Sequence, residues 1–157
     1  MEVDICIIKP GGDHSIMEHK CHYHNRGENM LNNNLELFCK IYLDTDFDRA
    51  LILPNIREVI GGELEQYSSL ANENCNLYVL RNDDFHEHRR NELPDGFLFS
   101  RYLIELEPNE DVGAETYITT ISRLLEGLWS RGYNAVASCD FEELLPKKGG
   151  YNPDNKL

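Results

Sequence analysis

The sequence predicts an α+β fold: a two-layer sandwich with a mostly antiparallel sheet and two main helices on one face, ferredoxin-like in its general plan. Three observations support this prediction. Residues 97–140 have the pattern of a β-α-β unit, residues 35–60 that of a strand followed by a helix, and residues 63–82 that of a hairpin. The resulting order over residues 35–140 is β-α-β-β-β-α-β. Such a plan hosts many unrelated activities, so it indicates no function by itself.

The β-α-β unit has the clearest pattern in the chain. Its helix has an apolar stripe at the spacing of one helical face, formed by Tyr117, Ile121, Leu124, Leu125 and Leu128. Arg131 and Gly132 then give the expected end of this helix. The strand before it, residues 97–106, is apolar on both faces in places, and the strand after it, residues 134–140, is built of small residues. Because one helix connects two strands of the same sheet, we expect these strands to be parallel.

Residues 35–43 alternate between apolar and polar side chains, as in a strand with one buried face. The acids that follow, Asp44, Asp46 and Asp48, suit either the start of a helix or the oxygen ligands of magnesium or calcium. The helix start is the better interpretation, with Asp44 and Asp46 as caps and Asp48 in the first turn.

Pro54 predicts an interruption of that helix, so we expect two short pieces over residues 46–53 and 55–60. After two glycines, a hairpin is expected, with a short strand over residues 63–67, a polar turn over residues 68–74 and a second strand over residues 75–82.

By composition the chain has three parts. Residues 1–34 are a polar, histidine-rich N-terminal extension, in which residues 2–9 alternate as a strand would. Residues 35–146 are predicted to form a single α+β domain, and residues 147–157 a loose C-terminal tail. Whether the core needs residues 1–29 stays open.

The formal net charge of −13 is the strongest feature of the composition. It disfavours nucleic acid and anionic membranes as partners and fits a basic protein partner, although solubility alone explains it equally well. No apolar run approaches the roughly 20 residues that a membrane helix needs. The five cysteines form no compact disulfide framework and the N-terminus lacks the basic region of a secretory signal, so we expect a cytoplasmic location.

Two histidine pairs are weak candidates for a divalent metal site: His22 and His24 in the extension, and His86 and His88 in the domain. Imidazole is a common zinc ligand, and a His-x-His pair in a strand places both rings on one side. Neither spacing matches an established zinc motif, and His86-Glu87-His88 is not the HExxH of metalloproteases. We therefore expect no cofactor, with a divalent metal as the alternative.

The polar composition of residues 83–96 predicts a loop. A loop of this length is uncommon in a compact domain, which indicates a recognition role. Its arginines, with Arg101 nearby, either neutralise neighbouring acids or hold an anion. The acidic edge after the strand at residues 134–140 is a second candidate region. Together these two regions give the predicted partner-binding residues Asp83, Asp84, Arg89, Arg90, Asp140 and Glu142.

No set of residues in the sequence combines a nucleophile, a base and an orienting group at a recognisable spacing. The sequence therefore favours a non-enzymatic cytoplasmic binding domain with an acidic surface for a basic protein partner, as in an inhibitor or an immunity-type protein. One alternative is a metal-dependent enzyme that uses histidines together with an acid such as Asp140. Another is a homodimer without a ligand, in which a second copy covers an open sheet edge or face.

Overall fold

A six-stranded sheet forms the centre of the computed structural model, which describes residues 35–66 and 68–153. The strand order is β2-β3-β4-β5-β1-β6, and every neighbouring pair is antiparallel. The elements in chain order are β1 (Cys39–Asp44), α1 (Arg49–Ile60), β2 (Glu63–Glu65), β3 (Ser69–Ala71), β4 (Cys75–Arg81), β5 (Tyr102–Pro108), α2 (Ala114–Ser130) and β6 (Asn134–Ser138).

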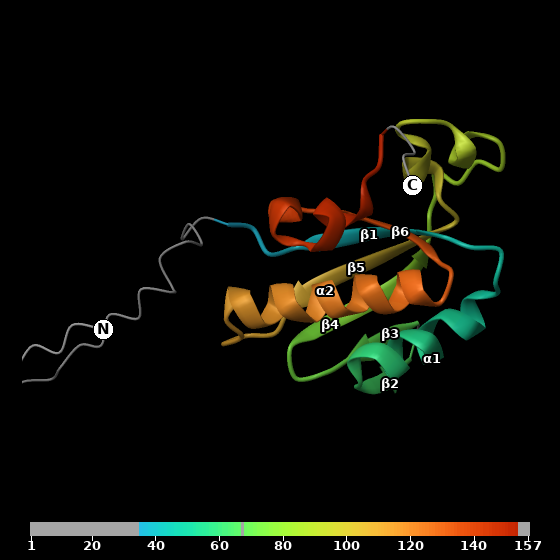
Figure 1. The fold of residues 1–157 in the computed structure, drawn as a ribbon. Coiled ribbons are helices and arrows are strands. Elements are labelled where there is room, and N and C mark those ends of the chain that lie inside the picture. Colours follow the sequence, from blue (N-terminus) through green and yellow to red (C-terminus); the bar gives the residue numbers. More distant parts are fainter. Residues whose placement is uncertain (1–34, 67, 154–157) are drawn as a thin grey trace, which may run out of the picture. The chain divides into compact units, whose positions relative to one another are not determined.

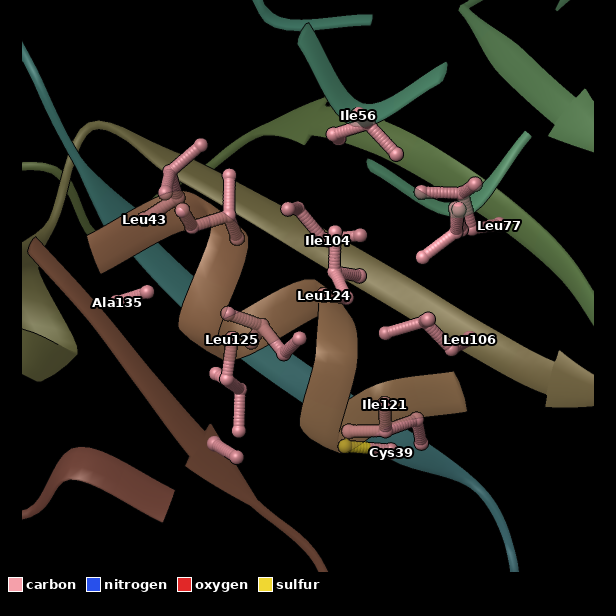
Figure 2. Close-up of a cluster of buried hydrophobic side chains, with 14 of the residues drawn as sticks. Cys39, Leu43, Ile56, Leu77, Ile104, Leu106, Ile121, Leu124, Leu125 and Ala135 are labelled. Atoms are coloured by element: carbon pink, nitrogen blue, oxygen red, sulfur yellow. The ribbon is translucent and has the colours of Figure 1, made fainter. Parts of the chain in front are cut away.

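The two helices lie on the same face of this sheet and pack against each other (Figure 1). Alternate strand residues such as Ile41, Leu77 and Ile104 are fully buried, and they meet the apolar faces of both helices in one core. Figure 2 shows Leu124 and Leu125 of α2 over the strands, with Ile56 of α1 at the side of the cluster. The predicted α+β sandwich with an antiparallel sheet is therefore confirmed.

The β-α-β unit is present, although its two strands are not neighbours. β5 and β6 each pair antiparallel with β1, which lies between them. Two strands that are both antiparallel to a third are parallel to each other, as the sequence predicted. The small residues Ala135 and Ala137 of β6 are buried beneath α2 and the C-terminal segment.

The prediction of two helical pieces around Pro54 was wrong, because α1 is one helix from Arg49 to Ile60. Pro54 lies within it and its side chain is exposed, so the ring meets solvent instead of the core. Burial of Ile52, Ile56 and Ile60 along one face stabilises the helix across the missing hydrogen bond. The helix is capped by Asp48, whose Oδ1 accepts from the Ala50 amide at 2.8 Å, and not by Asp44 or Asp46.

Three other boundaries differ from the prediction. β1 begins at Cys39 instead of residue 35, although Leu35 and Leu37 pack against the core. The predicted turn at residues 68–74 contains the short strand β3. Gly96–Phe99 form a 3₁₀ turn, although a strand was expected from residue 97, because the Gly96 amide donates to the Glu92 carbonyl and the Leu98 carbonyl accepts from Asn82.

The C-terminal segment is ordered further than predicted. Pro146–Gly150 form a tight turn against β6, in which Lys147 and Lys148 have left-handed backbone, and Gly149 is buried beside Ala137. Gly150 has a φ of +92°, and a Cβ there would come within 2.6 Å of the Ala135 carbonyl oxygen. The Trp129 indole donates to that same carbonyl at 3.0 Å. This segment and Trp129 therefore cover the outer edge of β6, an edge that would otherwise be open to further pairing.

Candidate interaction site at the loop between β4 and β5

Residues 82–101 connect β4 to β5, and their conformation depends on the buried side chain of Asn82. Its Nδ2 donates to the carbonyl oxygens of Leu98 and Ser100 at 2.9 and 2.8 Å. Its Oδ1 accepts from the Asp84 amide at 3.1 Å. One side chain thus joins the two ends of the loop and satisfies backbone groups that β-pairing does not reach.

Arg90 anchors the loop to the end of β1. Its side chain is only 11% exposed and contacts Asp44 at 3.4 Å, Asp46 at 2.9 Å and Glu87 at 3.1 Å. Arg101 approaches Asp46 and Glu87 from the other side, and its amide donates to Asp44 Oδ1 at 3.1 Å. The hydrogen bond from Arg90 holds the pKa of the Asp46 carboxyl below its ordinary value, and the same bond raises the pKa of Arg90.

Aromatic rings engage the same arginines. The Arg89 guanidinium lies 3.7 Å from the Phe99 ring centre and pairs with Glu92 at 3.4 Å. The Arg101 guanidinium lies 4.8 Å from the ring centre of Phe85. Of the two interpretations left open by the sequence, the neutralisation of neighbouring acids is therefore the one that the contacts support.

Other side chains of the loop point outward. Asp83 and Asp84 are exposed, and neither belongs to an ion pair within the part of the chain that the structure describes. Leu93 and Leu98 are 59% and 38% exposed, and Asp95 is exposed while its carboxylate accepts from the Tyr151 hydroxyl at 3.3 Å. We call Asp83, Asp84, Leu93, Asp95 and Leu98 the loop surface. Its two leucines were not among the predicted partner-binding residues, although Leu93, an apolar residue beside Pro94 in a polar loop, was a usable signal.

A pocket of about 410 Å³ lies between this loop, β6 and the C-terminal segment. Arg90, Glu92 and the cis Leu93-Pro94 pair line it from the loop, and Asn134 and Tyr151 line it from the other side. The pocket has room for one large side chain, and the Glu92 carboxylate at its rim is already paired with Arg89.

The six predicted partner-binding residues do not form one surface. Asp83, Asp84, Arg89 and Arg90 lie near the Asp44 end of β1, and Arg89 and Arg90 are engaged internally. Asp140 and Glu142 follow β6, whose last residues pair with the Cys39 end of β1. Asp140 is exposed, while Glu142 Oε1 accepts from the Cys139 amide at 3.1 Å. The length of β1 separates the two groups.

The histidine candidates give no metal site in the described chain. His86 Nδ1 accepts from the amides of His88 and Arg89, both at 3.3 Å, so this nitrogen holds the loop backbone. His22 and His24 lie outside the described residues. Among residues 35–66 and 68–153, no group of three or more His, Cys, Asp or Glu side chains is arranged to hold a metal ion.

No protein-family model, curated protein or solved structure matches the chain significantly. Among the described residues, no helix combines the length and apolar character that crossing a bilayer requires.

Proposed function

We propose that this chain is a non-enzymatic cytoplasmic binding domain, inhibitor or immunity-like, whose loop surface holds a basic protein. One observation supports this above all: the arginines of the loop are used in internal ion pairs and ring contacts, while Asp83, Asp84 and two leucines face outward. The loop therefore exposes both apolar and acidic side chains. Interfaces combine an apolar centre with a polar rim in the same way.

Charge supports the class of partner. The whole chain has a formal net charge of −13, so its field attracts a basic protein and raises the rate of encounter. The internal ion pairs also hold the loop in one conformation before binding, which lowers the entropy lost in the complex. A reducing compartment is consistent with the free thiols of Cys39, Cys75 and Cys139.

For the fold we propose a ferredoxin-like plan with an added hairpin. The supporting feature is the run β4-β5-β1-β6 within the sheet. In that run, β1 and β4 are parallel with β5 between them, and β5 and β6 are parallel with β1 between them. Each parallel pair is connected through a helix, and the strands β2 and β3 extend the sheet beyond β4.

The test is capture from native lysate on the immobilised full chain, in parallel with two double variants. Asp83→Asn/Asp84→Asn removes two of the three acids of the loop surface. Glu115→Gln/Glu126→Gln removes the same charge from exposed positions of α2 and is the matched control. We expect a basic protein on the wild-type chain and on the control, weaker retention by the loop variant, and elution by salt.

Retention of a partner to the same extent by the loop variant and the control contradicts the loop surface as the binding site. Salt-insensitive elution, or no captured protein at all, contradicts the proposed function itself.

A further inference from the structure

Cys39 and Cys139 oppose each other where β1 and β6 meet. Lys40 pairs with Ser138, so one further step along this antiparallel ladder places Cys39 opposite Cys139. Directly opposed residues have Cα atoms about 4.5–5.5 Å apart, within the roughly 4.4–6.8 Å that a disulfide spans. Both residues are free thiols in the structure, and their side chains share a hydrogen bond.

The two thiols differ in access. Cys39 is fully buried, and Figure 2 shows it beside Ile121 at the end of the core. Cys139 is half-buried and lines an open pocket of about 300 Å³ together with Glu36, Phe38, Lys40, Ser138, Asp140 and Glu142. Because Cys139 is the more exposed of the two residues, a small reagent reaches it first.

The two thiols also differ in acidity: Cys139, the more accessible thiol, is also the more acidic one. The hydrogen bond from Cys39 lowers the pKa of Cys139, aided by the Phe141 amide and opposed by burial and by Glu142 and Asp140. The same hydrogen bond and burial raise the pKa of Cys39. The proton of the pair thus remains on the buried sulfur, and the accessible sulfur has the greater thiolate character.

We propose that Cys139 and Cys39 form a thiol-disulfide exchange site that takes small cationic disulfides and closes into a disulfide between β1 and β6. The Cys139 thiolate attacks one sulfur of the reagent, forming a mixed disulfide and releasing one reagent thiolate. The Cys39 sulfur then loses its proton and attacks the Cys139 sulfur, releasing the second reagent thiolate. The protein loses two electrons and two protons, and the reagent becomes two thiols.

The preference for a cation follows from the acids of the pocket, Glu36, Asp140 and Glu142. Its single lysine, Lys40, lies 3.9 Å from Glu105 on β5. One contact between unit charges at 4 Å in water is worth about 1 kcal/mol, so a cationic disulfide should react about fivefold faster than a neutral one, and an anionic one should react more slowly than the neutral one.

The experiment treats the reduced full chain with cystamine, which is cationic, or oxidised glutathione, which is anionic, and blocks the remaining thiols. Intact mass and peptide mapping then identify the products. We expect a Cys39–Cys139 cross-link in the wild-type chain, faster with cystamine after correction for the rates with a free model thiol. Cys75, fully buried on β4, should stay unmodified.

Variants separate the two steps. Cys39→Ser should stop at the mixed disulfide on Cys139, Cys139→Ser should lose both products, and Cys75→Ser should behave as the wild type. Mapping of the wild-type product does not depend on how any variant folds. A disulfide that instead includes Cys6, Cys21 or Cys75, or equal corrected rates for the two reagents, overturns the proposal.

Discussion

Asn82 has an influence on the loop that its position in the sequence does not reveal. In the sequence it follows the apolar strand β4, so it was predicted to end that strand. In the structure its side chain makes hydrogen bonds to three backbone groups of the loop. Such bonds depend on the approach of Leu98 and Ser100, which lie far along the chain. The residue type of Asn82 predicted the end of the strand, but its role in holding the loop depends on tertiary contacts.

We expect Asn82→Ala to lower the free energy of unfolding by about 1–3 kcal/mol, because buried carbonyl oxygens lose their donors. Urea denaturation measures this change. Asn91→Ala is the control, because Asn91 is exposed and its side chain makes no hydrogen bond to any residue that the structure describes. Equal stability of the two variants would show that Asn82 does not hold the loop.

The lowered pKa of Asp46 predicts how the stability of the fold depends on pH. Because the pKa of its carboxyl is lowered in the folded chain, its ion pair with Arg90 stabilises the fold fully above the ordinary pKa of 3.8. This contribution is lost as the pH falls below that value. Asp46→Asn should therefore have a slightly lower urea midpoint than wild type at about pH 7, and the difference should shrink as the pH falls below 3.8 through the lowered pKa. A difference that persists in acid contradicts the ion pair as its cause.

The acids Asp44, Asp46 and Asp48 show how far residue type alone predicts a role. A helix start was expected at this point, and a helix does begin with a capping aspartate. Which aspartate caps, and that the other two bind arginines of a distant loop, depends on contacts across the sheet. Local chemistry predicted the element, but it contained no information about the non-local partners.

At the scale of elements, the two helices approach closely at Gly127. A Cβ on this residue of α2 would lie 2.5 Å from both γ carbons of Val59 on α1. Valine is stiff at χ1, so it does not move aside easily. The glycine thus permits close packing of the two helices, a property that helix periodicity does not reveal.

We expect Gly127→Ala to destabilise the chain by about 1 kcal/mol, because overpacking outweighs the gain in helix propensity. Combining it with Val59→Ala should relieve the clash. The double variant should then be more stable than the sum of the two single effects predicts, as measured by urea denaturation. Additive effects would show that the two positions do not crowd each other.

Two of the errors at this scale, at Pro54 and at Gly96–Phe99, have a shared physical reason. Both rested on local preference, one for a break and one for a strand. In α1 the buried isoleucines outweigh the break, and before β5 the bonds to Asn82 and His86 outweigh the strand pattern. The amphipathic pattern of α2, by contrast, was sufficient because local preference and tertiary burial agree there.

For the whole molecule, the excess of acidic residues affects stability as well as the proposed binding. A formal net charge of −13 destabilises the compact state through repulsion, and salt screens this repulsion. The antiparallel sheet and the two helices were predictable, since alternation and helical stripes extend over long segments. The order of the strands was not, because it depends on pairings between distant residues.

We expect the free energy of unfolding in urea to rise by roughly 1 kcal/mol between about 0.01 M and about 1 M sodium chloride. Asp83→Asn/Asp84→Asn should show a smaller rise, because two charges are gone. A fall in stability with salt would show that the internal ion pairs of Arg90 and Arg101 outweigh the net repulsion.

Hydrogen exchange on the complex with the captured basic partner tests the proposed interaction most directly. Binding at the loop surface should slow exchange of amides in residues 82–101, while the turn at residues 109–113, at the other end of β5, should exchange at the rate of the free chain. Protection confined to α1 and α2, or to residues 138–143 beyond β6, would contradict the loop surface as the binding site.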